Sequence, residues 1–428
     1  MADTGLHLEI SRDELRNKLA ELIRIQSVVE DGHTEMGVVE AVMGWCKTDG
    51  IPFETFEVTP GRLNLLMEWK GHRAGPTLLF EAHSDTVTAG DVGQWTRPPF
   101  QLTQEGDRLY GRGTADTKGN LVAAYVGLRD LAHTVKGAFS GSIQLLIPID
   151  EEGMMTGIRH YIASGRMRDI AAAICCEPED AQISIRQKGA LRIRVEIRGK
   201  MAHGAMPLTG NNPLRVMARF LLAVEETERQ EQDRLGFDRY LGWPSITPTE
   251  IQAPIKGPSG FNVMPDSAAV SLDIRTVVGQ SHHELTERLR DALDRVVLEA
   301  NRELAGYTAT LRERLEESIN AGEFQATLHV LDDRPVTDTN RDDPIVKAVA
   351  GAVAHRLQKP VVYSGVPGAT DGTWLWNAGI PIVTTGAGNR YVPHQRDEWV
   401  SFQQLHDMAH IYADAAYRFF SHTTGVEE

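Results

Sequence analysis

Carboxylate and imidazole side chains recur directly after strand-like apolar runs, where they could bind metal ions. The groups are His83-Ser84-Asp85 after Leu78 to Phe80, Glu151-Glu152 after Ile143 to Ile149, Glu177 after Ile174 to Cys176, Asp116 within Gly111 to Gly119, and His394 after Val392-Pro393. Carboxylate oxygens and imidazole nitrogens are ligands that divalent metals take in hydrolytic enzymes. The set is large enough for two metals and one spare carboxylate. It predicts a hydrolase.

The ligands divide into two sites that share one carboxylate. A bridging carboxylate can hold two cations about 3.5 to 4 Å apart, and Asp116, in its glycine-flanked turn, is the candidate bridge. His83 and Glu177 would complete one metal site. Glu152 and His394 would complete the other.

Two further side chains have roles beside these ligands. Glu151 is left free to take a proton from the attacking water and to pass it to the leaving nitrogen. Asp85, two residues after His83, is placed to orient the imidazole. An isolated His-x-Asp or Glu-Glu is common on protein surfaces. The joint placement of His83, Glu151 and Glu177 at strand ends favours the functional interpretation.

The elements that must position these groups alternate along the chain. The capping box Ser11 to Glu14 predicts a helix from Arg12 to Ile25. Further expected elements are helices at 36–47, 120–134, 344–358 and 402–420 and strands at 63–69, 77–82, 142–149, 171–176 and 380–385. Strand and helix alternation predicts an α/β fold with a mostly parallel sheet covered by helices. Ligands gather beyond the carboxyl ends of such strands.

The middle of the chain has a different pattern. Expected strands at 191–197, 246–253, 268–275 and 324–331 and helices at 213–229 and 283–301 follow the order strand-helix-strand-strand-helix-strand. This order is typical of a two-layer α+β, ferredoxin-like domain. We therefore expect an inserted domain over 188–334, able to act as a lid, within a discontinuous catalytic domain formed by 1–187 and 335–428.

The charge and cysteine content of the sequence restrict the classes of binding partner and the compartment that we expect. The 428 residues carry 44 Lys and Arg against 59 Asp and Glu, a formal charge of -15, which repels nucleic acids and anionic membranes. We expect a small-molecule substrate, with neither nucleic acid nor membrane as a partner. Three cysteines within apolar runs suit reduced thiols. With a polar, acidic start and no long apolar run, the sequence predicts a cytoplasmic protein.

Several segments together resemble a known family. They are Ala82 to Val87, Gly111 to Gly119, Asp150 to Gly153, Glu177-Pro178, Gly199 to Pro207 and Thr370 to Gly372. The series resembles the acetylornithine deacetylase, succinyl-diaminopimelate desuccinylase and glutamate carboxypeptidase family of dinuclear metallohydrolases. The resemblance implies two divalent ions, usually zinc, with cobalt or manganese serving in some members. It also implies that the inserted domain mediates formation of a homodimer.

The same resemblance suggests residues that contact the substrate. His203 matches a histidine that stabilises the tetrahedral oxyanion, often from the partner subunit. Asn262 and Arg275 match positions that grip the polar or carboxylate end of the substrate, although Arg275 is equally well explained as a strand-edge charge. Asp371 either caps the helix that follows it or lines the pocket.

Four positions depart from the usual pattern of the family without removing a ligand. Thr117 stands where many members carry methionine, Asn120 replaces a frequent glycine, and Arg390 and Tyr391 lie close to the last ligand in sequence. These departures leave the substrate open.

The expected activity is hydrolysis of an amide bond in a small N-acylated amino acid or a related carboxylate-bearing substrate. A dipeptidase or carboxypeptidase remains an alternative, as does a hydrolase of a non-peptide C–N bond such as that of an aromatic amine. The non-enzymatic alternative is a silent, metal-stabilised binding or dimerisation module.

Overall fold

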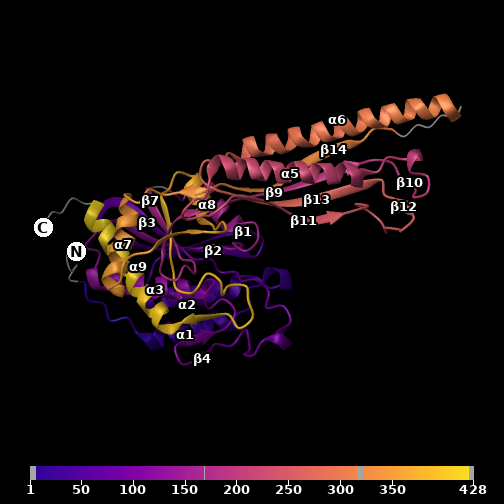
Figure 1. Ribbon diagram of the computed structural model, residues 1–428. Coiled ribbons are helices and arrows are strands. Elements are labelled where there is room, and N and C mark those ends of the chain that lie inside the picture. The colour runs from indigo at the N-terminus through magenta and orange to yellow at the C-terminus, as the bar shows by residue number, and fades with distance from the viewer. Residues whose placement is uncertain (1–5, 168, 316–321, 424–428) are drawn as a thin grey trace. The chain divides into compact units, whose positions relative to one another are not determined.

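The computed structural model describes residues 6–167, 169–315 and 322–423, and the chain divides into two compact units (Figure 1). Unit 1 comprises residues 1–187, 337–366 and 370–428, and unit 2 comprises residues 188–336 and 367–369. Each unit has its own sheet and helices. Within the described residues, no helix is long and apolar enough to cross a membrane.

Unit 1 is built on a sheet with the strand order β1-β2-β6-β3-β7-β17-β8-β15, and β16 pairs with β8. The pairs β6–β3, β3–β7 and β7–β17 at its centre are parallel, whereas β1, β2 and β15 add antiparallel neighbours at the edges. The strands are β1 (Phe53–Thr59), β2 (Arg62–Lys70), β3 (Arg73–Glu81), β6 (Ser140–Ile147), β7 (Ile170–Cys175), β8 (Ile183–Gln187), β15 (Thr337–Asp338), β16 (Tyr363–Val366) and β17 (Ile382–Thr384).

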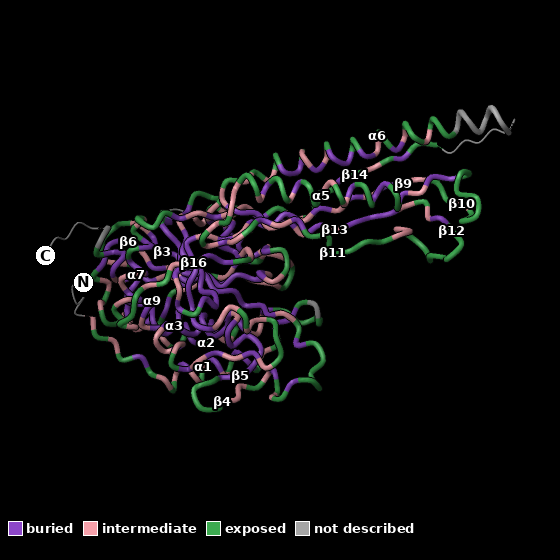
Figure 2. Tube along the Cα trace, in the orientation of Figure 1, coloured by how far each residue is buried: buried purple, intermediate pink, exposed green. Residues whose placement is uncertain are grey.

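Helices cover both faces of this sheet because successive strand residues point to opposite sides. Phe80 packs edge-on against Tyr412 of α9, while Leu79 belongs to the core cluster that contains Tyr161 of α4 and Leu375 of α8. The central strands are buried on both faces (Figure 2). The helices of unit 1 are α1 (Arg12–Arg24), α2 (Met36–Asp49), α3 (Lys118–Val135), α4 (Thr156–Ala163), α7 (Pro344–Leu357), α8 (Gly372–Asn377) and α9 (Phe402–Thr423).

The predicted fold class is confirmed, and the parallel pairing lies where the predicted site needs it. Strands β6, β3 and β7 run in the same direction, so their carboxyl ends meet at one edge of the sheet. A small separate sheet, β18-β5-β4, joins β4 (Thr103–Glu105) and β5 (Arg108–Tyr110) to β18 (Trp399–Ser401). The sequence pattern did not predict strands β1, β8 and β18 or helix α4, whereas α8 is the helix expected directly after Asp371.

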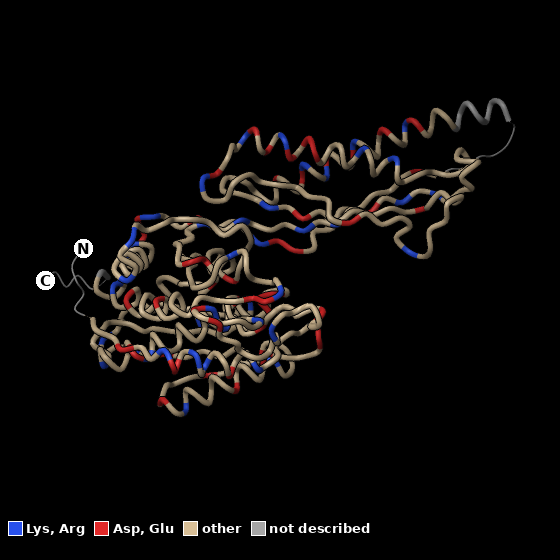
Figure 3. Tube along the Cα trace, turned by 60° about the horizontal axis from the view of Figure 1, so that its bottom comes forward, with Lys and Arg blue, Asp and Glu red and all other residues tan. Residues whose placement is uncertain are grey.

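Unit 2 is an antiparallel sheet with the order β11-β13-β9-β14 and two helices. Along the chain its elements are β9 (Gly189–Arg198), β10 (Ala202–His203), α5 (Pro213–Leu235), β11 (Ser245–Gln252), β12 (Val263–Met264), β13 (Ser267–Thr276), α6 (His282–Leu315) and β14 (Gln325–Arg334). Inward-facing residues of the strands share one apolar core with α5 and α6. This is the expected ferredoxin-like arrangement. Figure 3 shows positive and negative residues interspersed along its helices.

Candidate metal centre

The sheet brings the predicted side chains to the carboxyl ends of three adjacent strands. His83 lies two residues beyond β3, Glu177 lies two residues beyond β7, and Glu151 lies four residues beyond β6. Asp116 comes from the turn between β5 and α3, and His394 from the loop before β18. Residues more than three hundred positions apart therefore meet at one place.

Asp116 lies between two imidazoles. Its Oδ1 is 3.0 Å from Nε2 of His83, and its Oδ2 is 3.4 Å from Nε2 of His394. Nε2 of His83 is also 3.7 Å from Oε1 of Glu177, and Nε2 of His394 is 3.0 Å from Oε1 of Glu152. One carboxylate that offers each of its oxygens to a different imidazole has the arrangement of a bridging ligand.

The orientation of His83 follows from its other ring nitrogen. Nδ1 is 3.1 Å from the backbone carbonyl oxygen of Asp85 and 3.4 Å from Oδ1 of the same residue. Because a carbonyl can only accept, Nδ1 carries the hydrogen and Nε2 points toward Asp116. Nε2 and the Asp116 carboxylate must then share either a proton or a cation.

The carboxylate of Asp85 also joins two of the loops. Its Oδ1 accepts the backbone N–H of Glu151 at 3.1 Å, and its Oδ2 accepts that of Glu152 at 3.0 Å. The loop after β3 thereby fixes the backbone of the loop after β6. Asp85 orients His83 through both its backbone and its side chain.

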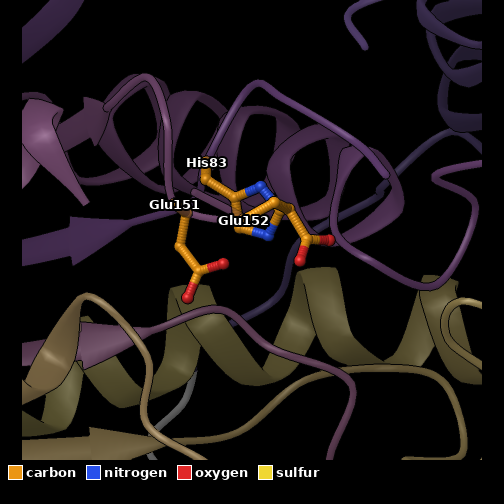
Figure 4. Close-up of side chains that lie close together, drawn as sticks. All are labelled: His83, Glu151 and Glu152. Atoms are coloured by element: carbon orange, nitrogen blue, oxygen red, sulfur yellow. The ribbon is translucent and has the colours of Figure 1, made fainter. Parts of the chain in front are cut away.

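Three sets of side chains could each hold a metal ion, because within each set one ligand atom per residue lies within 4.8 Å of the others. The sets are His83, Asp116 and Glu177; Asp116, Glu152 and His394; and His83, Glu151 and Glu152. Figure 4 shows Glu151 and Glu152 beside the imidazole of His83. The first two sets match the division expected from the sequence, and the third shows how close Glu151 lies to both.

Burial of so many acids shifts their proton affinity. Loss of solvent raises the pKa of Glu151 well above its usual value, against the opposing effect of His83, and the carboxylates of Glu152 and Asp116 add to the rise. The pKa of Glu177 is also raised well above the usual value, mainly by burial. Without positive charge between them, these carboxylates are difficult to ionise together.

The pKa values of the two imidazoles and of Asp116 shift toward the charged form of each group. Hydrogen bonds with Asp116 and Glu152 raise the pKa of His394 to about 10. Burial opposes the charging of His83, but its bonds with Asp116 and Asp85 outweigh burial and raise its pKa well above normal. The pKa of Asp116 is lowered because bonds with His394 and His83 overcome its burial.

The donor set fits divalent cations. Imidazole nitrogens and carboxylate oxygens surround a position where positive charge is needed, and they belong to the ligand types that zinc, manganese and cobalt accept. The two sets that share Asp116 each contain three protein ligands. A metal ion held by three protein ligands keeps an open position, which is typical of a catalytic rather than a structural site.

Asp371 lies in unit 1 and is fully buried. It occupies the N-cap position of α8 without forming a side-chain cap bond, so the first of its two alternative roles, capping the helix, is not observed. Among the described residues no donor reaches either of its oxygens. Burial raises its pKa well above normal, and the carboxylates of Glu81 and Glu151 add to the effect.

The other substrate candidates lie in unit 2. His203 on β10 pairs with Val263 on β12, and the N–H of Gly204 donates to the carbonyl of Asn262, so His203 and Asn262 are neighbours. Arg275 lies near the far end of β13, where it pairs with Asp273 at 2.6 Å. The length of this strand separates Arg275 from the other two.

Two of the departures from the family pattern hold loops of the site together. Thr117 donates its hydroxyl to the carbonyl of Cys176, the residue before Glu177. Asn120 donates to the carbonyls of Ala115 at 3.2 Å and Ala387 at 3.0 Å. These polar side chains connect the Asp116 turn with the strand ends around it.

Sequence reasoning missed several buried acids near the site, among them Glu398 and Glu179. Glu398 has nearly no exposed side-chain area and contacts the Asp116 turn. Glu179 pairs with Arg390 and accepts the hydroxyl of Ser184. The spacings of four residues from His394 to Glu398 and of two from Glu177 to Glu179 were the available signals, but neither spacing indicates a role without the loop geometry.

Known proteins resemble this chain in sequence over most of its length. The family model described as Peptidase family M20/M25/M40 matches residues 79–418. A probable succinyl-diaminopimelate desuccinylase of Staphylococcus epidermidis is 24% identical over 430 residues, covering 94% of this chain and 96% of the relative. A succinyl-diaminopimelate desuccinylase of Alkalilimnicola ehrlichii is 28% identical over 368 residues, covering 84% and 88%.

Solved structures share the fold over nearly the whole chain. An M20 family metallo-carboxypeptidase from Sulfolobus solfataricus has a TM-score of 0.71 at 20% identity, covering 95% of this chain and 99% of the other. A Bacillus subtilis protein described as a dinuclear metal binding peptidase from M20 family has a TM-score of 0.68 at 17% identity, covering 96% and 98%.

Proposed function

The chain belongs to peptidase family M20/M25/M40 and is a metal-dependent hydrolase, and from this premise we propose that it cleaves the amide bond of a small N-acylated amino acid or a related carboxylate-bearing substrate. The observation that carries the proposal is Asp116, whose two oxygens face the imidazoles of His83 and His394. With Glu177 beside the first imidazole and Glu152 beside the second, the side chains form two ligand sets that share one carboxylate.

In this proposal, different residues of the protein have different roles in the hydrolysis. Two divalent ions bound by the ligand sets would polarise the amide carbonyl and lower the pKa of a water molecule. Glu151 takes the proton from the attacking water and delivers it to the leaving nitrogen. Its burial and its raised pKa suit it to hold that proton between the two transfers. Asp85 keeps Nε2 of His83 directed toward the ligand set.

Residues of the insertion are proposed to bind the substrate. His203 donates to the oxyanion of the tetrahedral intermediate, and Asn262 and Arg275 bind the polar or carboxylate end. Because β13 separates Arg275 from the other two within one chain, this proposal requires His203 and Asn262 to act from the partner subunit of the proposed homodimer. Arginine suits a carboxylate because its guanidinium donates two parallel hydrogen bonds. Support for the acyl-amino-acid substrate comes from the desuccinylase names of the relatives. We also propose that the insertion mediates a homodimer, that zinc is the resident metal, and that the protein is cytoplasmic.

Two other activities use the same residues. A dipeptidase or carboxypeptidase is favoured by the metallo-carboxypeptidase that shares the fold. Hydrolysis of a non-peptide C–N bond, such as that of an aromatic amine, needs the same activated water. The silent binding module is the least supported interpretation, because Glu151 and every candidate ligand are present in the site.

A substrate panel tests the proposal. The metal-stripped protein is supplied in turn with zinc, cobalt or manganese and assayed against N-succinyl and N-acetyl amino acids, dipeptides and aminobenzoates. We expect turnover of an acylated amino acid in the presence of metal and none after chelation. Turnover confined to dipeptides or to aminobenzoates would select the corresponding alternative. No turnover of any amide with any ion would contradict the proposal.

A further inference from the structure

The loop that carries His394 is joined to the turn that carries Asp116 by a buried carboxylate, Glu398. Its Oε1 accepts the backbone N–H groups of Gly113 at 3.1 Å, Ala115 at 3.0 Å and Asp116 at 3.1 Å. Its Oε2 accepts the guanidinium of Arg112 at 2.6 Å. One carboxylate therefore occupies the concave side of the turn, where successive N–H groups form an anion site.

Backbone contacts strengthen the same connection. The N–H of Gly111 donates to the carbonyl of Glu398 at 2.9 Å. Strand β5, which leads into the turn, pairs with β18, which directly follows Glu398, and Tyr110 faces Trp399. The turn is thus held along its whole entry and over its inner face by the segment that follows His394.

The neighbouring Asp397 anchors the other side of this segment. Its carboxylate accepts the N–H and the hydroxyl of Thr96, at 2.9 and 2.8 Å, and the N–H of Arg97 at 3.3 Å. Glu398 and Asp397 consequently bind two different parts of unit 1. Of these two carboxylates, it is Glu398 that accepts the backbone N–H of a candidate metal ligand, Asp116.

We propose that Glu398 is a positioning residue that sets the place of the Asp116 carboxylate relative to His394 and so determines how tightly the metal ions bind. Glu398 belongs to none of the three candidate ligand sets. It acts through the N–H of Asp116, and charge-assisted bonds of this kind are about twice as strong as neutral ones. Residues that orient metal ligands typically change metal affinity about 10- to 100-fold when they are replaced.

The substitution Glu398→Gln tests this role with little change in size. An amide has one oxygen, so its NH₂ group must face either the guanidinium of Arg112 or the three N–H groups of the turn, and both are donors. Asp414→Asn is the matched control. Asp414 is a nearly buried carboxylate in the same unit that pairs with Arg418 at 3.0 Å and with His355, and it belongs to α9, outside the loops of the candidate metal centre.

Cobalt titration of the metal-stripped protein measures the effect. Stoichiometry, affinity by chelator competition and the visible absorption of bound Co²⁺ are recorded together with Tm. We expect Glu398→Gln to weaken binding about tenfold or more and to alter the cobalt spectrum. Asp414→Asn should lower Tm, leave the cobalt affinity within about twofold of the wild-type value and leave the cobalt spectrum unchanged.

Wild-type cobalt affinity and spectrum in Glu398→Gln would overturn the proposal, as would equal loss of affinity in both variants. Arg112→Lys decides the question if Glu398→Gln does not fold. Lysine keeps the charge but has one nitrogen in place of the two that now contact Glu398 and the carbonyl of Thr88. We expect weaker cobalt binding in that variant too, and unchanged binding would count against the proposal. The titrations involve no substrate, so failure to find a substrate would leave them unaffected.

Discussion

At the scale of single residues, Glu151 has the environment of a general base. It is buried beside two candidate ligand sets, and its pKa is raised well above normal. Glu151→Gln keeps the shape and removes the proton acceptor. We expect kcat to fall about 10²- to 10⁴-fold, while the number of bound metal ions stays at the wild-type value. Steady-state kinetics and metal analysis measure both quantities, and a variant with wild-type kcat would exclude Glu151 as the base.

The buried carboxyl group of Asp371 should make the stability of the folded protein depend on pH. In the unfolded chain its pKa returns to about 3.8, whereas in the folded protein it lies well above this value. The folded form then binds the proton more tightly, and the wild type loses stability as the pH rises from about 4 through the folded pKa. Asp371→Asn has no such loss.

The stability advantage of metal-free Asp371→Asn over metal-free wild type should therefore grow between pH 4 and pH 7. The expected increase is roughly 1.4 kcal/mol for each unit of pKa difference. Thermal unfolding of both metal-free proteins across this range measures it. Adding metal should shrink the difference, since nearby cations favour the ionised carboxylate. A difference that stayed constant with pH would contradict the assignment.

The contrast between these residues and Glu398 explains what the sequence can reveal about a site. His83, Glu151 and Glu177 were predictable because each follows an apolar run that forms a buried parallel strand. Glu398 was not predictable, because its partners are mainly backbone N–H groups of one turn, and such groups carry no signature in side-chain identity. Asp371 was identified, but its lack of partners appears only in the packed structure.

At the scale of elements, α3 begins directly after the Asp116 turn and packs closely on α9. A Cβ added at Gly127 of α3 would lie 2.2 Å from the carbonyl oxygen of Ala409 in α9. Gly127→Ala should therefore force the helices apart and destabilise the protein by about 1 to 3 kcal/mol. Gly44→Ala in α2 is the matched control, because a Cβ there meets nothing within 4 Å.

Gly44→Ala should stabilise the protein by roughly 0.5 to 1 kcal/mol, since alanine is the better helix former. Denaturant unfolding of the two variants gives both signs in one experiment. Equal effects of the two substitutions would show that close contact between α3 and α9 does not limit the residue at position 127.

Two of the strands that sequence reasoning missed have weak apolar patterns. The run Phe53–Thr59 of β1 buries only Phe56, so its pattern does not show an apolar face. Strand β8 alternates the buried Ile183 and Ile185 with polar residues, but it spans only five residues and ends at the buried Gln187, whose amide bonds to Thr370 and Thr384. Apolar periodicity is a clear signal only in longer runs with one apolar face, and it misses short strands and strands with few buried apolar residues.

At the scale of the whole molecule, metal binding should be coupled to protons. Hydrogen bonds with Asp116 and Glu152 raise the pKa of His394 to about 10, and burial raises that of Glu177 well above normal. In the metal-free protein these ligands hold protons that a cation must displace. The rise in Tm on adding zinc should consequently be small at pH 5.5 and increase toward pH 8. A rise independent of pH would contradict the proposed ligands.

Deletion of the insertion tests whether metal binding and turnover depend on different units of the chain. Within unit 1, Gln187 pairs with Thr337, so the two ends left by removing residues 188–336 are already neighbours. Within unit 2, Ala190 pairs with Arg334, and the core of this unit is its own. Replacing 188–336 by a short glycine-rich linker should leave a folded catalytic unit, because closing a short loop between adjacent strands costs little.

We expect the shortened protein to bind two cobalt ions with affinity close to that of the full chain and to lose turnover. All the candidate ligands belong to unit 1, whereas His203, Asn262 and Arg275 are removed with the insertion. Circular dichroism, cobalt titration and the substrate assay separate these outcomes. If the shortened protein folds, binds cobalt and keeps wild-type kcat/KM, the insertion takes no part in the reaction. A shortened protein that folds without binding cobalt would show that the metal centre depends on unit 2.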